Sequence, residues 1–186
     1  VGGTGGGGAA IALNFLGRTA TEADSSKQVK AEVLNSNLKS GGAVLVQALS
    51  SSSIDSMAIA VGVGGSAAVT GANTTNWLED EITATWSGGS LYGSGNSLTV
   101  QAQDGASVET LASNVSASGS AAVGAALAVN KVGSAVLANL SGMTLHAAAA
   151  VRVDADMTGM IKSVAASAAV SGGGAVNGSF TTNQLT

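Results

Sequence analysis

The sequence predicts an all-β protein: a parallel β-helix, in which short coils of chain stack along a common axis. Three observations predict it, namely a repeat of about 54 residues, an alternation of small and larger apolar residues with a period of two, and the absence of proline. Stacked repeats bury an apolar face that no single repeat could bury alone. We therefore expect residues 1–186 to form a single β-helix segment of a larger protein.

The repeat is visible in two independent landmarks. Blocks ending in asparagine recur at nearly equal spacing at Asn76, Asn130 and Asn183, and a fourth block ends at Asn14, somewhat further upstream of Asn76 than the repeat alone would place it. Short apolar stretches that begin at residues 44, 98 and 151 repeat in parallel. Because asparagine tolerates left-handed backbone angles, we expect the four asparagines to occupy one recurrent turn position.

A shorter spacing divides each repeat into three. Apolar residues recur at about a third of the repeat in three pairs: Val29 and Val46, Ile82 and Val100, Val136 and Val153. This spacing predicts a coil of about 18 residues, three coils per repeat, and a rod about 50 Å long if neighbouring coils lie about 4.8 Å apart. The turn asparagines would then recur once in three coils, which is too seldom for a continuous ladder.

The local pattern favours strands over helices. Residues 57–63 and 125–129 alternate with a period of two, whereas a helix would need a period near 3.6. Glycine-rich runs at 64–66, 88–90 and 172–174 are typical of turns. The absence of proline leaves every backbone N–H available to a ladder.

Composition excludes several classes of function. Charged residues make up 10% of the chain and the net charge is −4, which disfavours nucleic acid as a partner. There is no cysteine, so disulfides and thiolate metal sites are excluded. Two charge-free stretches, 56–78 and 110–130, are long enough to span a bilayer as helices, but their glycine, serine and asparagine content argues against membrane insertion.

Two departures from the repeat mark candidate binding regions. The first repeat carries nine extra residues within 15–28, predicted to leave the stack as a loop that could bind a partner. The second departure is a short aromatic and acidic patch at 77–81, which could stack a sugar ring or contact a protein. The candidate partner-binding residues are Arg18, Glu22, Asp24, Lys27, Trp77, Glu79, Asp80 and Glu81.

The Ala- and Gly-rich blocks that end in asparagine, as in residues 120–130, are followed by a Val-x-Val stretch such as 151–153. In this style of repeat, nearly the whole chain resembles the passengers of filamentous-haemagglutinin-like and leukotoxin-like bacterial adhesins. The resemblance implies a right-handed parallel β-helix, secreted by a type V pathway to the cell surface or the medium. It implies a stalk and an adhesive surface, with a host or neighbouring-cell protein or glycan as partner.

The alternatives are a carbohydrate-active β-helix enzyme and an ice-binding solenoid. An enzyme needs converging carboxylates, and the adjacent acids of 79–81 cannot all face one substrate. Ice binding needs many Thr-x-Thr motifs aligned on one flat face, whereas the motif at 83–85 stands nearly alone in this sequence. We interpret Asp154 and Asp156, with Asp104 one repeat earlier, as outward carboxylates rather than a calcium site. We expect no catalysis and no cofactor, and self-association through exposed strand edges or ends.

Overall fold

The computed structural model describes residues 3–17 and 27–186, the side chains of 94–96 and 147–149 excepted. The described residues form parallel strands and no helix, which confirms the all-β, parallel-strand prediction. The strands are β1 (Gly5–Leu16), β2 (Lys27–Lys39), β3 (Val44–Ser50), β4 (Ser53–Gly64), β5 (Ala67–Asp104), β6 (Ser107–Ser118), β7 (Ala121–Ser141), β8 (Thr144–Met157), β9 (Met160–Ser171) and β10 (Gly174–Leu185).

Two sheets organise these strands. One has seven strands and follows the order β1-β5-β7-β10, with β2, β3 and β8 also paired to β5. The other has three strands, in the order β4-β6-β9. The 38-residue strand β5 pairs with β1, β2 and β3 in turn, so each repeat of the chain lies along the repeat before it. We call these successive layers levels: residues 5–64, 67–118 and 121–171, with 174–185 beginning a fourth.

The register corrects the predicted coil length. Asn76 pairs directly with Asn130, one full repeat later, so these residues lie in adjacent levels and not three layers apart. The predicted coil of a third of a repeat is wrong, because Val29 packs against the same apolar core of the wide end to which the buried Val46 belongs. The shorter spacing therefore joins parts of a single level, whereas the full repeat joins neighbouring levels.

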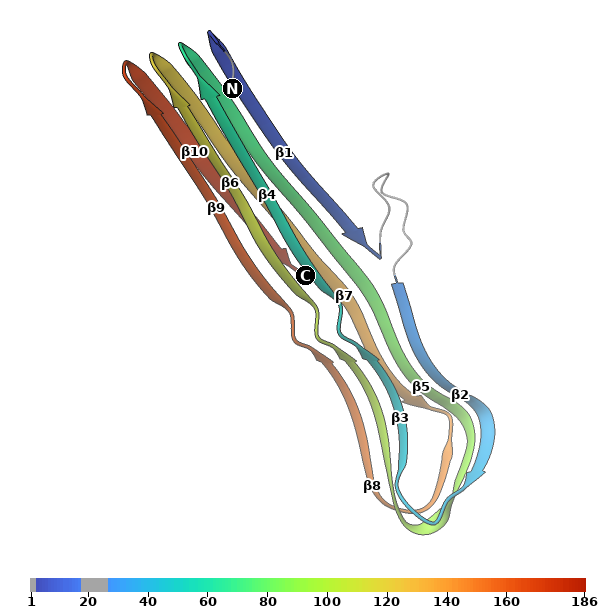
Figure 1. Cartoon of the computed structure of the whole chain (residues 1–186). Helices are drawn as coiled ribbons and strands as arrows, with labels where there is room; N and C mark the ends of the chain where they lie inside the picture. Colours follow the sequence, from blue (N-terminus) through green and yellow to red (C-terminus); the bar gives the residue numbers. More distant parts are fainter. Residues whose placement is uncertain (1–2, 18–26) are drawn as a thin grey trace.

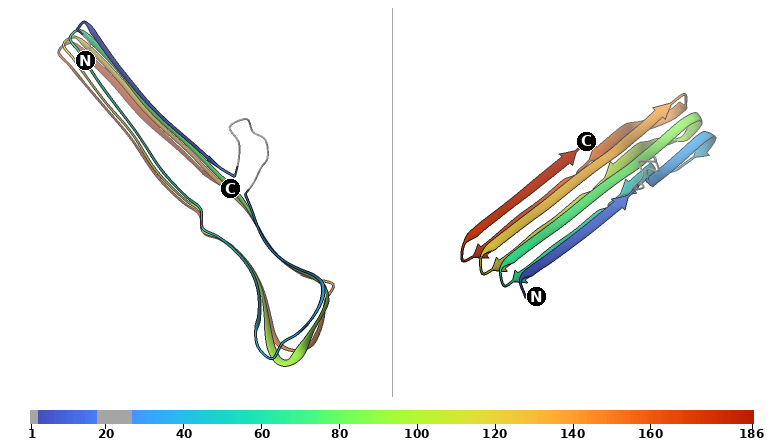
Figure 2. Two further views of the ribbon diagram at one scale, coloured as in Figure 1. Left: turned by 45° about the vertical axis from the view of Figure 1, so that its right-hand side comes forward. Right: turned by 90° about the horizontal axis from the view of Figure 1, so that it is seen from above.

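The long axis of the molecule therefore runs along the strands, whereas the long axis of the predicted rod would run along the stacking direction. The strands run along its long dimension, and the levels lie side by side across it (Figures 1 and 2). At about 3.3 Å per residue, the stretch 67–92 alone extends roughly 80 Å, whereas each level adds only about 4.8 Å across the strands. The predicted rod of many thin coils is replaced by a few wide, flat levels.

Each level has two parts of different width. In the narrow half, β4, β6 and β9 run alongside β1, the beginnings of β5 and β7, and β10 as a second layer (Figure 1). The wide end is a broader loop of β2, β3, β8 and the remainder of β5 and β7 (Figure 2). The narrow half comprises residues 5–16, 53–78, 107–132 and 160–185, and the wide end comprises 27–50, 80–104 and 134–157.

Side-chain size explains the two widths. The core of the wide end contains large residues, among them Trp86, Leu91 and Leu98, which are at most 1% exposed. In the narrow half, two of the buried clusters consist of alanines alone, one around Ala72 and one around Ala126. Small inward side chains allow the two sheets to approach closely.

Turns form at two of the predicted glycine runs, 64–66 and 172–174, between the ends of successive strands. The third run lies within β5, where Gly88 and Gly89 have positive φ angles of 72° and 81°. This left-handed backbone bends the strand without ending it, and glycine adopts it at little steric cost. The wide end therefore bends within a single strand, β5, at the point where its partner changes from β7 to β8.

Candidate functional site

The two predicted binding regions meet at one place on the seven-stranded sheet. Leu16 pairs with Leu78 and Lys27 pairs with Asp80, so the register advances by two residues in the second level while it advances by eleven in the first. The described residues on either side of the insertion therefore lie beside the 77–81 patch. Arg18, Glu22 and Asp24 lie outside the described residues.

The period-two alternation divides the 77–81 patch between two faces. Trp77, Glu79 and Glu81 face outward and are half-buried, whereas Asp80 faces the interior and is 2% exposed. Asp80 is therefore not accessible to a partner. Trp86 also lies outside the patch, because it is fully buried in the core of the wide end.

The outward residues of the patch contact side chains of the neighbouring levels. Trp77 packs edge-on against Phe15, with ring centroids 5.4 Å apart. Lys131 forms an ion pair with Glu79 at 3.1 Å. Glu81 accepts a hydrogen bond of 2.7 Å from Gln28 and lies 3.9 Å from the Lys30 ammonium group. The patch is thus an aromatic surface with neutralised carboxylates, which suits packing against a partner better than catalysis.

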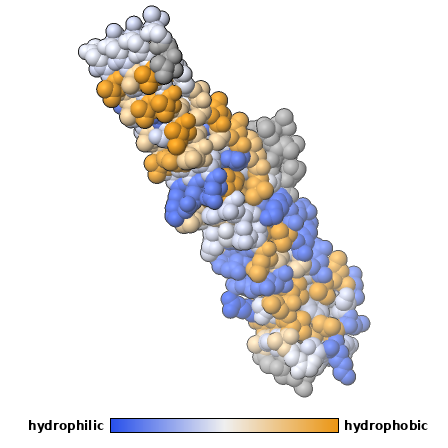
Figure 3. Space-filling model, in the orientation of Figure 1, coloured by the Kyte–Doolittle hydropathy of each residue, from blue (hydrophilic) through white to orange (hydrophobic). Residues whose placement is uncertain are grey.

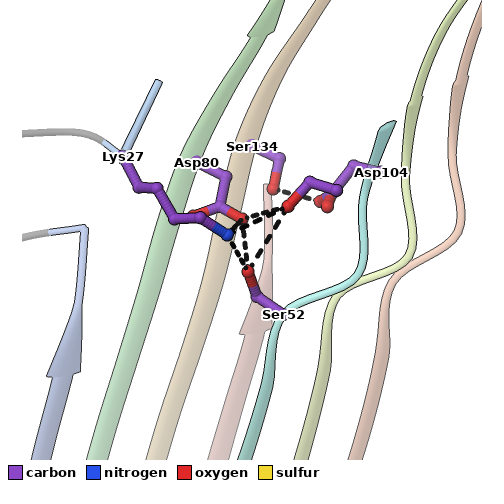
Figure 4. A network of polar contacts seen from close by, with 6 residues as sticks. Lys27, Ser52, Asp80, Asp104 and Ser134 are labelled. Atoms are coloured by element: carbon purple, nitrogen blue, oxygen red, sulfur yellow. Dashed lines mark hydrogen bonds and ion pairs between the residues drawn. The ribbon is translucent and has the colours of Figure 1, made fainter. Parts of the chain in front are cut away.

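Behind the patch, Asp80 belongs to a polar network between the narrow half and the wide end (Figure 4). The hydroxyls of Ser50 and Ser52 donate to Asp80 Oδ2 at 2.8 and 2.7 Å. The Lys27 ammonium group donates to Ser52 Oγ at 2.8 Å and lies 3.7 Å from the same carboxylate oxygen. These contacts connect the two walls of the chain, one carrying β2 and β5 and the other the segment around Ser52.

Asp104 enters the same region from the opposite wall. It is fully buried and accepts a hydrogen bond of 2.5 Å from Ser134. The prediction that Asp104 is an outward carboxylate is wrong, because it pairs with Met157 and not with Asp156. A one-residue offset moves a side chain to the other face of a strand. Asp154, by contrast, is ion-paired with Arg152 at 2.7 Å, beside which the sequence placed it.

The four repeated asparagines form a ladder through the interior of the narrow half. Asn14 donates to Asn76 at 2.8 Å, Asn76 to Asn130 at 2.8 Å, and Asn130 to Asn183 at 2.9 Å. Thr110 joins the ladder from the facing sheet, accepting from Asn76 at 2.9 Å and donating to Asn130 at 2.7 Å. The predicted turn position is wrong, because all four asparagines lie inside strands.

The ladder exists because adjacent levels are one repeat apart. A buried amide needs a donor and an acceptor partner, and an identical amide about 4.8 Å above and below supplies both. The strict recurrence of asparagine was the signal in the sequence. The tolerance of asparagine for left-handed backbone angles points to a turn instead, and a coil of a third of a repeat would rule out a continuous ladder.

Other candidate chemistry is sparse in the described part of the chain. It contains no group of three or more His, Asp or Glu side chains that could hold a metal ion. His146 stacks on Tyr92, with ring centroids 4.4 Å apart and planes 7° from parallel. A search of the same residues finds no helix suited to crossing a membrane.

The described residues also form an extensive apolar surface that the sequence did not predict. Large apolar residues face outward on both sheets of the narrow half, and many are more than half exposed. Figure 3 shows apolar surface on one face of the narrow half. The most exposed include Ile11, Leu13, Val69, Val176 and Phe180 on the seven-stranded sheet and Met57, Ile59, Val61, Val164 and Val170 on the three-stranded sheet. Alternation predicted the strands but did not say which set of alternating residues faces inward.

No family model, curated protein or solved structure matches this chain. Membership of the bacterial adhesins therefore stays a prediction. The geometry of the strands, the polar interior and the exposed surfaces is the basis for the function proposed below.

Proposed function

We propose that this chain is a segment of a right-handed parallel β-helix, serving as a stalk and an adhesive surface of a secreted or cell-surface bacterial exoprotein. The observation that carries the proposal is the register. Strands one repeat apart pair in parallel in both sheets, over nearly the full length of the described chain. A right-handed path is the form that parallel crossovers take in about 98% of cases.

Repeat-to-repeat pairing favours a structural role. Each new repeat can use the strand edges of the one before it, so such a chain lengthens without a new core design. Each level adds about 4.8 Å in height but presents walls tens of ångströms long. The geometry thus supports a broad scaffold with large faces, a more surface-rich form than the thin rod expected from the shorter coil.

For the adhesive contact we propose the outward patch around Trp77, together with the insertion beside it. A partly exposed tryptophan flanked by paired charges is a common anchor for a protein or a sugar ring. The partner would be a host or neighbouring-cell protein or glycan. The insertion would supply Arg18, Glu22 and Asp24 as further contacts.

The test is adhesion of beads coated with the chain to epithelial cells and to a glycan array under flow. We expect binding above that of uncoated beads, and a loss of several-fold in Trp77→Ala. Leu137→Ala is the matched control, because Leu137 is also an outward apolar residue but lies in the wide end. Unchanged binding by Trp77→Ala would exclude the patch, and absence of binding to every surface would refute the adhesive role.

The enzymatic alternative is tested with the same protein. Incubation with a panel of polysaccharides should release no products. Product formation that disappears in Glu79→Gln would replace the adhesive proposal with the carbohydrate-active one. Glu79 is chosen because it faces outward, whereas Asp80 is buried.

A further inference from the structure

The narrow half carries no charged side chain between its tip and a belt of charge at its base. Residues 56–78, 110–130 and 163–186 contain no Asp, Glu, Lys or Arg. The belt consists of Asp55, Glu109 and Lys162, which pair in register on the three-stranded sheet, and of Glu79 and Lys131, which form an ion pair on the seven-stranded sheet. Figure 3 shows this as an apolar region followed by a hydrophilic band. Contiguous apolar patches of several hundred Å² on a protein surface mark sites of interaction.

The outer face of the seven-stranded sheet has relief within this region. A groove crosses all four levels where the outward residues are small, and a ridge of larger residues lies two positions further along each strand. The groove column is Ala9, Gly71, Ala125 and Gly178. The ridge column is Ile11, Asn73, Leu127 and Phe180. A second ridge, Val69, Val123 and Val176, borders the other side of the groove.

We propose that this face docks against the same face of a second copy of the chain. The groove and the first ridge are adjacent, parallel columns. A two-fold rotation axis can lie midway between the groove and the first ridge, parallel to both columns. Rotation about this axis places the ridge of each copy in the groove of the other. Such an isologous contact uses one patch twice, as two-fold dimers do. Opposed sheets pack about 10 Å apart with side chains interdigitated, which matches a ridge entering a groove.

The size of the patch is sufficient for a specific dimer. Nine residues along each strand extend about 30 Å, and four strands side by side extend about 19 Å. The face therefore offers roughly 600 Å² per copy and about 1,200 Å² in total, at the lower end of the range for stable protein–protein interfaces. The absence of charge means that no ion needs to be desolvated on either side of the contact.

The relief of this face favours a protein partner over lipid. The core of a protein–protein interface is packed as closely as a protein interior, and the ridge and groove columns supply the complementary shapes that such packing needs. This inference does not rest on the adhesive role, since it uses neither Trp77 nor the insertion.

The groove offers a test that does not disturb the fold of one chain. A Cβ atom added at Gly71 or Gly178 would meet no atom within 4 Å, and neither glycine has a positive φ angle. Isoleucine at these two strand positions should therefore be accommodated, since β-branched residues favour strands. The double variant Gly71→Ile/Gly178→Ile fills the groove and should exclude the ridge of a second copy.

Sedimentation velocity from 1 to 100 µM is the measurement. We expect the unmodified chain to form a dimer in this range, and the double variant to raise the dissociation constant at least tenfold. Gly41→Ile is the matched control, because a Cβ there also meets open space but lies at the far end of the molecule. It should leave the dissociation constant unchanged.

A second variant controls for non-specific association caused by the added isoleucine side chains. Leu127→Asn places on the ridge the residue that already stands there in the level below, Asn73. It should also weaken the dimer. A chain that stays monomeric at 100 µM, or a dimer unaffected by both variants, would overturn the proposal. So would a monomer that sediments with phosphatidylcholine vesicles through this face, which would assign the face to lipid.

Discussion

Replacing Asn130 with alanine tests the central feature of the interior, the amide ladder. Asn130 is 1% exposed and makes three side-chain hydrogen bonds: it accepts from Asn76 and Thr110 and donates to Asn183. Asn130→Ala removes all three bonds and leaves the Thr110 hydroxyl without its acceptor. Asn76 keeps one acceptor, because its amide also donates to Thr110.

The magnitude follows from these contacts. A buried hydrogen bond contributes about 1 kcal/mol net, and a buried polar group left without a partner costs more. Three lost bonds and the small cavity left by the amide give a destabilisation of about 3–4 kcal/mol. For a domain of this size, each kcal/mol lowers Tm by about 2–4 °C, so Tm should fall by roughly 10 °C.

The assay is urea unfolding followed by circular dichroism in the β-sheet region of the far ultraviolet, with Asn139→Ala as the control. Asn139 lies on the same strand, β7, but alternates with the inward-packed Ala138 and Leu140 and so faces outward. The control should change the free energy of unfolding by less than about 0.5 kcal/mol. If Asn130→Ala costs no more than Asn139→Ala, the ladder does not stabilise the fold and the register of one repeat per level loses its main energetic support.

Three further outcomes follow from the structure. Lys27→Met should destabilise the chain by about 2 kcal/mol, because Asp80 then keeps a buried charge without its ammonium partner, and Asp80→Asn in the same chain should recover part of that loss in urea unfolding. Deleting residues 18–26 should leave the circular dichroism spectrum unchanged and the free energy of unfolding within about 1 kcal/mol, because Leu16 and Lys27 already pair in register with Leu78 and Asp80. The pKa of Lys162 is raised above its ordinary value by a hydrogen bond to Glu109 and by the charge of that carboxylate, so the stabilisation from this pair is present below the unfolded pKa and is lost as pH rises through the folded one. An NMR titration should show this upward shift, and Glu109→Gln should remove it.

The sequence predicted the strands and the correspondence of the repeats because both depend on local pattern. Alternation with a period of two needs only neighbouring residues, and the recurrence of asparagine blocks needs only counting. The registers Asn76 with Asn130 and Val46 with Val100 are those that alignment of the repeats implies. A register shared by stacked repeats is thus readable from self-similarity, without knowledge of the shape of a level.

The length of a level could not be read from the same pattern. A spacing of a third of a repeat between apolar positions arises either between coils or across one wide coil, and local chemistry does not distinguish them. Val29 and Val46 pack into one core because the wide end bends between them, around residues 40–43. At this bend the Ser40 N–H donates to the Tyr92 carbonyl of the next level at 3.0 Å, a contact that exists only in the assembled fold.

The candidate site was missed in part for a related reason. In the patch at 77–81, alternation alone implies that Asp80 faces away from Glu79 and Glu81. It does not say which of the two sets is inside. The inward direction of Asp80 is fixed by Ser50 and Ser52 on the opposite wall, which bond to its carboxylate. Sequence reasoning had no means of placing that wall.

The same ambiguity governs most of the narrow half, where the inward set is the small and polar one beyond the apolar cluster around Leu78 at its base. The alanine clusters and the asparagine ladder leave room for close sheets, and the larger outward set, such as Val61 and Leu127, would not fit between them. Every level has the same division into inward and outward residues. The outward apolar residues of successive levels therefore line up in columns, just as the inward asparagines line up in the ladder. Stacking of levels cannot cover them, since it buries strand edges and not faces. The repeat that builds the interior of this protein therefore also builds an apolar surface that only a partner can remove from water.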